Sequence, residues 1–271
     1  MKQRFAICNE TFGDWPWPRV CETVAALGYE GIEIAPFTFG TTVDEVSAAQ
    51  RAEIRRVAVD SGLEIVGLHW LLLTPPGLHL HSIDEPARLR TVDYLRKLID
   101  FAGDVDASVM VLGSPKQRRL ENDDFDGAWK RTRDSLTQLL PLLEARGVLL
   151  CQESLPAPDC DFIQTAAEAV RMIEEIGQAN YRLMLDTRSM SHESRPMADL
   201  IRDHCSLLHH VHANDANGRG PGFGDTDFAP VAEALRECEY TGYVSVEVFD
   251  YLPDPETIAR ESIRYLREIF A

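Results

Sequence analysis

The chain has 271 residues, of which 45% are hydrophobic and 26% are charged, and its 27 Lys and Arg against 44 Asp and Glu give a net charge of −17. This composition excludes a mainly disordered chain and allows a large hydrophobic core. The negative charge argues against nucleic acid and membrane surfaces as partners, because both are acidic and no block of Lys and Arg offsets the charge.

Three further features predict cytoplasmic localisation. The chain has no run of the about 18 apolar residues that a membrane helix needs, and its N-terminus turns polar too early for a signal peptide. The six cysteines are scattered and form no Cys-x-x-Cys pair, which indicates a reducing compartment. They are Cys8, Cys21, Cys151, Cys160, Cys205 and Cys238.

Short apolar runs alternate with longer amphipathic segments along the whole chain, which is the pattern of β-α units around a parallel sheet. The predicted strands are residues 5–9, 31–35, 64–70, 108–113, 148–154, 182–187, 207–212 and 243–249. Apolar residues at three- and four-residue spacing predict helices at residues 43–60, 88–101, 129–145, 165–176, 228–238 and 255–269. Weaker helical patterns lie between the first and second predicted strands and between the sixth and seventh.

Glycines stand where several of these helices should end. Gly28, Gly62, Gly147 and Gly177 occupy the position that favours a left-handed backbone just after a helix. Eight strand-helix repeats fit a closed (β/α)8 barrel, the TIM barrel fold, better than an open doubly wound sheet. No linker or low-complexity tract divides the chain, so residues 1–271 are predicted to form a single barrel domain.

Ionisable residues stand at the carboxyl ends of four consecutive predicted strands, the fifth to the eighth. They are Glu153, Asp186, His212 and Glu247, and we call them the quartet. In a barrel these ends meet at one rim, where active sites lie. Buried carboxylates without a partner are costly, so their convergence predicts a shared cation. This donor set suits Mn²⁺, Mg²⁺ or Co²⁺, with Zn²⁺ as a further candidate.

Each member of the quartet taken alone has a simpler interpretation. A single carboxylate at a strand end is commonly a helix cap, a loop hydrogen-bond acceptor or an ion-pair partner. Asp186, which precedes Thr187, could be a turn residue. The metal hypothesis is favoured because the alternative needs four separate explanations, and it depends on the barrel.

Five segments of the chain resemble the sugar isomerase/epimerase superfamily of xylose-isomerase-like barrels, which includes ketose 3-epimerases, inosose isomerases and dehydratases, and endonuclease IV. The segments are Cys-Gln-Glu-Ser at 151–154, Met-Leu-Asp-Thr at 184–187, His-His-Val-His at 209–212, the glycine-rich run at 217–225 and Ser-Val-Glu-Val-Phe at 245–249. The resemblance implies that the quartet binds one divalent metal and that Glu153 and Glu247 act as acid and base on opposite faces of the substrate. It also implies that Arg219 contacts a substrate oxygen and that the protein is a homodimer.

The chain departs from parts of this family pattern. Ketose 3-epimerases bind substrate with a histidine three residues after the strand-six aspartate, where this chain has Ser189 beside Arg188. Their glutamate six residues after the strand-five glutamate corresponds to Asp159. Endonuclease IV holds three zinc ions, but this chain keeps only His69 as a counterpart of the additional histidine ligands, and its acidic charge opposes DNA.

Three other residues are candidates for substrate binding. His69 and Trp70 follow the third predicted strand, where an imidazole could contact a hydroxyl and an indole could pack on sugar C–H groups. A rim histidine beside a core tryptophan is the equally weighted alternative. Lys116 belongs to a basic segment, 116–119, that could meet a phosphate or carboxylate, although a solvated loop is the simpler interpretation. Glu10 and Glu33 also lie near the first two strand ends, where they either shape the pocket or pair with Arg19 or Lys116.

These observations predict a metal-dependent sugar isomerase or epimerase. A metal-bound enediolate of a keto-sugar or polyol derivative would form, with Glu153 and Glu247 transferring the proton. A dehydratase or lyase that eliminates a group from the same enediolate is the main alternative, and an endonuclease-IV-like phosphodiesterase is a weaker one. A third alternative is a non-catalytic barrel that binds a sugar or a partner protein, and failure to bind any divalent metal would favour it.

Overall fold

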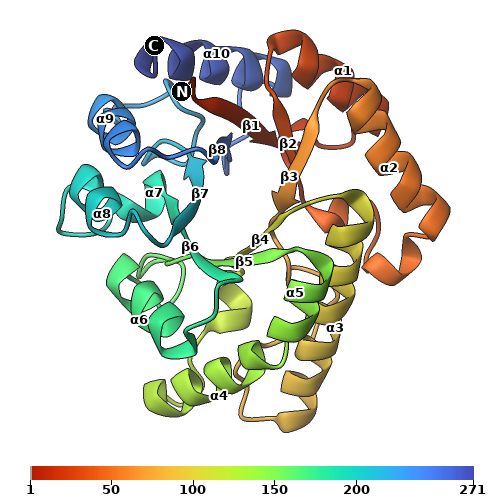
Figure 1. The fold of residues 1–271 in the computed structure, drawn as a ribbon, viewed down its shortest axis with the longest axis vertical. Helices are drawn as coiled ribbons and strands as arrows, with labels where there is room; N and C mark the ends of the chain where they lie inside the picture. Colours follow the sequence, from red (N-terminus) through yellow and green to blue (C-terminus); the bar gives the residue numbers. More distant parts are fainter. Residues whose placement is uncertain (1) are drawn as a thin grey trace.

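The computed structural model describes residues 2–271 and shows a closed barrel of eight parallel strands in sequential order. The strands are β1 (Arg4–Cys8), β2 (Gly31–Ile34), β3 (Glu64–Leu68), β4 (Val109–Leu112), β5 (Leu149–Gln152), β6 (Tyr181–Asp186), β7 (Leu208–Ala213) and β8 (Tyr243–Val246). Pairing of β1 with β8 closes the sheet, so it has no free edge. The predicted TIM barrel is confirmed (Figure 1).

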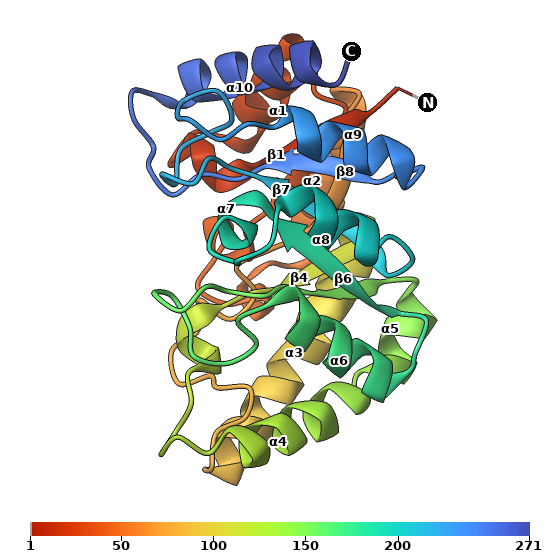
Figure 2. The same cartoon turned by 90° about the vertical axis from the view of Figure 1, so that its left-hand side faces the viewer.

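Helices surround the barrel on its outside (Figures 1 and 2). The α-helices are α1 (Trp17–Leu27), α2 (Ala48–Asp60), α3 (Glu85–Val105), α4 (Phe125–Thr137), α5 (Leu140–Arg146), α6 (Ala166–Ile176), α7 (Thr187–Met190), α8 (Met197–Asp203), α9 (Ala229–Glu237) and α10 (Pro255–Ile269). Four short 3₁₀ helices lie in the connections: η1 (Asn9–Phe12), η2 (Pro36–Thr38), η3 (Val43–Glu45) and η4 (Pro115–Arg118).

Two predicted helices are divided in the structure, and each division has a local cause. The predicted helix at 129–145 is interrupted between α4 and α5, because Pro141 lacks an N–H and its ring crowds the carbonyl of Thr137. The predicted helix at 43–60 divides into η3 and α2, and α2 begins after Ser47, whose side chain forms a capping box with Gln50. Gly28 and Gly177, at φ +93° and +65°, end α1 and α6 as predicted.

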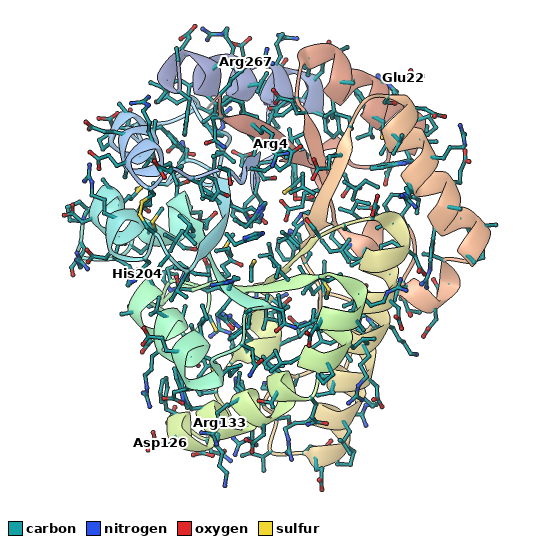
Figure 3. All side chains as sticks on the ribbon, in the orientation of Figure 1. Arg4, Glu22, Asp126, Arg133, His204 and Arg267 are labelled. Atoms are coloured by element: carbon teal, nitrogen blue, oxygen red, sulfur yellow. A yellow bond between two sulfur atoms is a disulfide. The ribbon has the colours of Figure 1, made fainter. Side chains whose placement is uncertain are left out.

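The main hydrophobic core lies between the strands and the helices. It is built from Val, Ile, Leu and Phe side chains of both layers, including the fully buried Ile32, Leu98 and Phe101. Charged side chains such as Asp126, Arg133 and Arg267 lie at the periphery (Figure 3). The interior of the barrel differs from this outer core, because several of its buried side chains are polar.

One pair of cysteines was not predicted from the sequence. A disulfide joins Cys205, which follows α8, to Cys238 at the end of α9, and their Cα atoms are 5.5 Å apart (Figure 3). The two residues are 33 positions apart in sequence and meet because α8 packs beside α9. No helix formed by the described residues combines the length and the apolar character needed to cross a membrane.

Candidate active site

Four consecutive strands place the quartet at one rim of the barrel. Glu153 directly follows β5, Asp186 is the last residue of β6, and Glu247 directly follows β8. His212 lies one residue before the end of β7, where it pairs in register with Asp186 on β6. Because all strands are parallel and adjacent, their carboxyl ends bring these side chains together.

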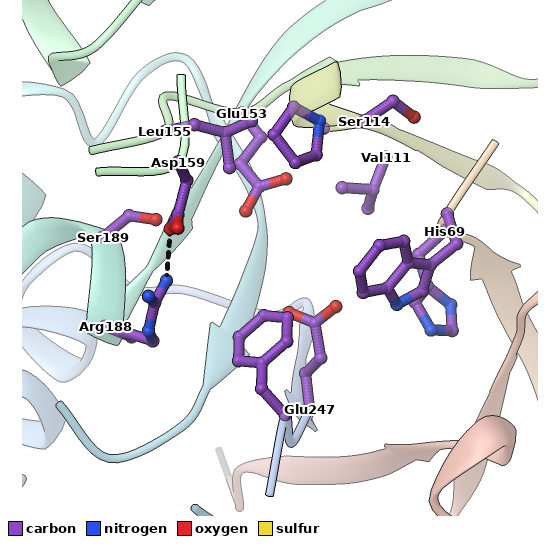
Figure 4. A pocket seen from close by; sticks show the side chains of 13 residues that line it. His69, Val111, Ser114, Glu153, Leu155, Asp159, Arg188, Ser189 and Glu247 are labelled. Carbon is purple, nitrogen blue, oxygen red and sulfur yellow. Dashed lines mark hydrogen bonds and ion pairs between the residues drawn. The ribbon is translucent and has the colours of Figure 1, made fainter. Parts of the chain in front are cut away.

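The quartet residues form a compact, buried cluster. Each of them offers one ligand atom, and these atoms all lie within 4.8 Å of one another. Their relative exposure is only 8% for Glu153, 2% for Asp186, 1% for His212 and 6% for Glu247. In the close view, the carboxyl groups of Glu153 and Glu247 lie on opposite sides of a pocket and point toward each other (Figure 4).

Hydrogen bonds fix two members of the quartet. Asp186 accepts a hydrogen bond from the Ser189 amide and another from Asn214 Nδ2, each at 2.6 Å. His212 Nδ1 lies 3.0 Å from Glu247 Oε2. These contacts hold the carboxylate of Asp186 and the imidazole of His212 in place before any ligand arrives.

The electrostatics of the cluster depend on three close carboxylates. Burial, and then the charges of Glu247 and Asp186, raise the pKa of Glu153 to about 8. Burial and the charge of Glu247 likewise raise the pKa of Asp186. Burial acts to raise the pKa of Glu247 too, but the charge and hydrogen bond of His212 outweigh it and lower that pKa. The cluster therefore carries more negative charge than its single histidine balances.

This donor set fits a divalent cation. Three carboxylates and one imidazole are ligands that suit Mn²⁺, Mg²⁺, Co²⁺ or Zn²⁺, and a positive ion at their centre would relieve the repulsion that raises the pKa of Glu153. Two further groups bring Cys8 together with Glu33 and His212, and with Glu10 and His69. Burial, and then the charge of Glu33, raise the pKa of the Cys8 thiol well above its usual range, which opposes a thiolate ligand.

A pocket with about 760 Å³ of empty space, part of it open to solvent, lies over the quartet. Glu153 and Glu247 line it together with aromatic and aliphatic side chains. Trp70 and Phe249 meet edge to face with ring centroids 6.1 Å apart, and Trp70 has a left-handed backbone at φ +52°. Carboxylates between apolar walls are typical of a site for a small polar ligand with C–H faces.

The four predicted substrate-binding residues lie in different places. His69 and Trp70 line the pocket beside Glu153 and Glu247. Lys116 is exposed on η4, and Arg219 donates a hydrogen bond to the Leu252 carbonyl at 3.1 Å. Neither Lys116 nor Arg219 is among the residues that line this pocket.

The basic segment at 116–119 does not form a cationic patch in the pocket. Arg118 is fully buried, and its Nη1 donates to the carbonyl of Glu153 at 2.8 Å and to the carbonyl of Leu112 at 3.1 Å. Arg119 points elsewhere and donates to the Asp159 carbonyl at 3.0 Å. Arg118 therefore supports the backbone that carries Glu153.

An ion pair in the pocket was not predicted from the sequence. Arg188 Nη1 lies 2.7 Å from Asp159 Oδ2, and both residues line the pocket (Figure 4). The Arg188 guanidinium also lies 5.1 Å from the ring centre of Phe249. Both charged residues occupy or adjoin positions where the chain departs from the ketose 3-epimerase pattern. That departure from the family pattern marked the two positions in the sequence, but it could not show that the side chains of Arg188 and Asp159 form an ion pair.

Glu10 and Glu33 pair with histidines inside the barrel instead of with Arg19 or Lys116. Glu10 Oε2 lies 2.8 Å from His69 Nε2. Glu33 lies 2.9 Å from His210 Nε2 and 3.1 Å from His212 Nε2. Burial acts to raise the pKa of Glu33, but the charges and hydrogen bonds of His212 and His210 hold it well below its usual range.

Comparison with known proteins identifies the family. The family model of xylose isomerase-like TIM barrels matches residues 21–269. The chain belongs to this family. The resemblance seen in the sequence is thereby confirmed, and the family assignment covers the strands that carry all four quartet residues.

The relatives within the xylose isomerase-like family include several sugar epimerases. The chain is 29% identical to the D-psicose 3-epimerase of Agrobacterium fabrum over 84% of its own length and 78% of that protein. It is 33% identical to the D-psicose 3-epimerase of Ruminiclostridium cellulolyticum over 84% of its length and 76% of that protein. With the 3-dehydro-D-guloside 4-epimerase of Escherichia coli it shares 33% identity over 53% of its length and 55% of that protein.

Solved structures of other proteins show the same fold. A D-psicose 3-epimerase from Clostridium cellulolyticum H10 with D-tagatose has a TM-score of 0.85 at 23% identity, covering 100% of this chain and 99% of that one. A 3-keto-D-glucoside 4-epimerase from Escherichia coli has a TM-score of 0.84 at 23% identity, covering 98% and 100%.

Proposed function

We propose that this protein is a divalent-metal-dependent sugar epimerase or isomerase, which moves a proton on a carbon next to a carbonyl group. The observation that carries the proposal is the pair of buried carboxylates, Glu153 and Glu247, facing each other across the pocket (Figure 4). Proton transfer to either face of a bound sugar needs a proton-transferring group on each side. The named relatives, which are sugar epimerases of the isomerase class, support the same reaction class.

The quartet would hold one Mn²⁺, Mg²⁺ or Co²⁺ ion, with Zn²⁺ as a further candidate. When bound, such a cation supplies Lewis-acid stabilisation of the negative charge that develops on a carbonyl oxygen. Asp186 is fixed by hydrogen bonds from Ser189 and Asn214, and His212 is fixed through Nε2 by Glu33, so both side chains would serve to hold the ion. Glu153 and Glu247 have a second task, because they also border the space that the substrate would occupy.

In the proposed reaction, one of Glu153 and Glu247 accepts the proton from the carbon beside the carbonyl as the C–H bond breaks. The other begins protonated and gives its proton to the opposite face of the same carbon, which inverts its configuration. Delivery to the former carbonyl carbon instead, with the hydroxyl proton of the adjacent carbon passing to the former carbonyl oxygen, would isomerise the sugar. The apolar walls formed by Trp70 and Phe249 limit the access of water to the carbanion, and His69 beside them offers a polar contact for a hydroxyl.

The charges in the pocket favour an uncharged sugar over a sugar phosphate. Among the described residues that line the pocket, Arg188 is the one Arg or Lys side chain, and Asp159 already pairs with it. A paired guanidinium and carboxylate offer donors and acceptors for hydroxyl groups without a net charge for a phosphate. We therefore assign recognition of sugar hydroxyls to this pair.

Proton NMR in D₂O with Mg²⁺-loaded protein tests the proposal on a panel of ketoses, inososes, keto-glycosides and their phosphates. The expected result is metal-dependent replacement of a hydrogen beside the carbonyl by deuterium, with the uncharged sugars reacting fastest. The metal-free protein and Glu247→Gln serve as controls. An unsaturated product that absorbs in the near ultraviolet would indicate a dehydratase or lyase instead, an alternative that Ser189 favours because it replaces a substrate-binding histidine. No exchange on any panel member by metal-loaded protein would contradict the proposal.

A further inference from the structure

Beneath the quartet, one carboxylate crosses the interior of the barrel. Glu33 lies on β2, next to Cys8 of β1 in the sheet register, and its side chain is fully buried. Its partners lie on β7, which is not a neighbour of β2 in the sheet. Glu33 therefore connects strands on different sides of the barrel through its centre.

Glu33 contacts the quartet histidine and that histidine's neighbour on the same strand face. Its carboxylate oxygens lie 3.1 and 3.2 Å from His212 Nε2, and Oε2 lies 2.9 Å from His210 Nε2. Because side chains at alternate positions of a strand share a face, His210 and His212 both point into the barrel. Both imidazoles are 1% exposed, so bulk water does not reach these nitrogens.

The two ring nitrogens of His212 face different groups. Nε2 faces Glu33, whereas Nδ1 lies 3.0 Å from Glu247 Oε2, on the side of the quartet. A carboxylate accepts hydrogen bonds and cannot donate them when ionised, so Glu33 requires a proton on Nε2. By the same rule Glu247 favours a proton on Nδ1 in the metal-free protein, and a cation at the quartet would displace that proton and use the lone pair of Nδ1, while the Nε2 proton stays with Glu33.

His210 gives Glu33 a second anchor. His210 Nε2 contacts Oε2, one of the two Glu33 oxygens that approach His212, so the carboxylate is held from two successive inward positions of β7. His69 Nδ1 approaches the other oxygen of Glu33 to 3.8 Å. These contacts restrict how far Glu33 can turn away from His212.

We propose that Glu33 is a positioning residue of the metal centre, which holds His212 with its proton on Nε2 and its Nδ1 directed at the cation. This inference rests on the proposed function only in assuming that the quartet binds a divalent ion. Glu33 does not line the pocket, so its contribution would pass through His212 and would affect metal binding before it affects substrate binding. Partners of this kind commonly change metal affinity by roughly 10- to 100-fold.

Isothermal titration of metal-free protein with Mn²⁺ tests the proposal. Wild type is expected to bind one ion, and Glu33→Gln to bind it roughly 10- to 100-fold more weakly while keeping its circular dichroism spectrum. Glu10→Gln is the matched control, because it makes the same change to a buried carboxylate that contacts His69 but is not in contact with His212. Its Mn²⁺ affinity is expected to stay within about twofold of wild type.

A second measurement needs no variant. Nitrogen-15 NMR of the Mg²⁺-loaded wild type is expected to show His212 with a proton on Nε2 and none on Nδ1. The opposite tautomer would overturn the proposal, as would equal Mn²⁺ affinity of wild type and Glu33→Gln. Binding of two ions by wild type would overturn it too, since Glu33 would then serve a second site with Cys8. Failure of the wild type to bind Mn²⁺ would instead contradict the metal dependence of the proposed function.

Discussion

Gly113, the residue after β4, lies directly against the carboxylate of Glu153: a Cβ atom added to Gly113 would overlap Glu153 Oε2. Gly113→Ala should therefore displace this carboxylate from the quartet without straining the backbone. We expect Mn²⁺ affinity and kcat each to fall at least about tenfold, as commonly happens when a metal or catalytic group is misplaced by about an ångström. Titration calorimetry and steady-state kinetics would measure the two effects.

Gly103→Ala is the control for this substitution. Gly103 lies inside α3, and an added Cβ would meet the guanidinium of Arg146, a flexible and partly exposed side chain that can move aside. Alanine is also the better helix former, so this variant should fold well and keep both Mn²⁺ affinity and kcat. Equal Mn²⁺ affinity and kcat of Gly113→Ala and Gly103→Ala would show that an added Cβ at position 113 does not displace Glu153 from the quartet.

Glu247→Gln should abolish turnover while the protein stays folded. Glutamine keeps the size of the side chain but cannot accept a proton from carbon, so kcat should fall by roughly 10²- to 10⁴-fold. Deuterium exchange into substrate, measured on metal-loaded protein, would check the loss. Near-normal exchange by a variant shown to contain metal would rule out the two-carboxylate mechanism.

The stability of the metal-free protein should depend on pH through Glu153. In the folded protein its pKa is raised from an ordinary value of 4.5 to about 8, by burial and then by Glu247 and Asp186. Between these two pH values the folded state binds more protons at this site than the unfolded state does. The contribution of Glu153 to stability is therefore present at low pH and is lost as pH rises through about 8.

Denaturant unfolding at several pH values, with the metal removed, would measure this dependence. Other groups titrate in the same range, so the informative quantity is the difference in unfolding free energy between wild type and Glu153→Gln, which has no titrating group at this position. The unfolding free energy of wild type should fall relative to that of Glu153→Gln between pH 5 and pH 8. A difference independent of pH would mean that Glu153 is ionised throughout.

Substitution of Asp159 should separate substrate recognition from metal binding. Asp159→Asn removes the partner of Arg188, and we expect KM for an uncharged sugar to rise about tenfold or more, since charge-assisted hydrogen bonds are worth about 1.5–3 kcal/mol. Mn²⁺ affinity should not change, because Asp159 is outside the quartet. The unpaired Arg188 should also make sugar phosphates better competitive inhibitors, which inhibition kinetics would show.

Removal of the metal should lower the melting temperature. An ion that binds the folded state alone at 100 times its Kd stabilises the protein by about 2.7 kcal/mol. For a chain of this size that corresponds to a shift of roughly 5–10 °C. Differential scanning calorimetry with Mn²⁺ and with excess EDTA would measure it, and Glu33→Gln should show a smaller shift at the same Mn²⁺ concentration. Identical melting temperatures of wild type under both conditions would contradict a resident cation.

The barrel could be predicted from the sequence because each strand is a short apolar run and several helices end at glycine. The errors arose where local chemistry interrupts a pattern, as Pro141 does between α4 and α5. Strand ends were placed up to three residues too far, as in the predicted strand at 243–249 against β8 (Tyr243–Val246). Glu247, Val248 and Phe249 continue the alternating polar and apolar pattern of β8 in sequence, while the backbone has already left the sheet.

The quartet could be predicted because its members occupy equivalent positions on successive strands, and strand order follows sequence order in this barrel. The contacts of Glu33 could not be predicted, because His210 lies 177 residues away in sequence. Glu33 and His210 meet only because β2 and β7 face each other across the interior of the barrel. The Arg188–Asp159 pair depends in the same way on how the β5–α6 loop folds toward α7. Side-chain pairs of this kind are a property of the assembled barrel.

The position of Glu33 on β2 has a consequence for how such a site could arise or be dissected. A half-barrel fragment that begins after β4 would contain β5 to β8 and all four quartet residues, yet it would lack Glu33, His69 and Glu10. His212 in that fragment would have no partner for Nε2. Duplication or fusion of half-barrels could supply the cation's ligands from one half, but the support for their histidine has to come from the other.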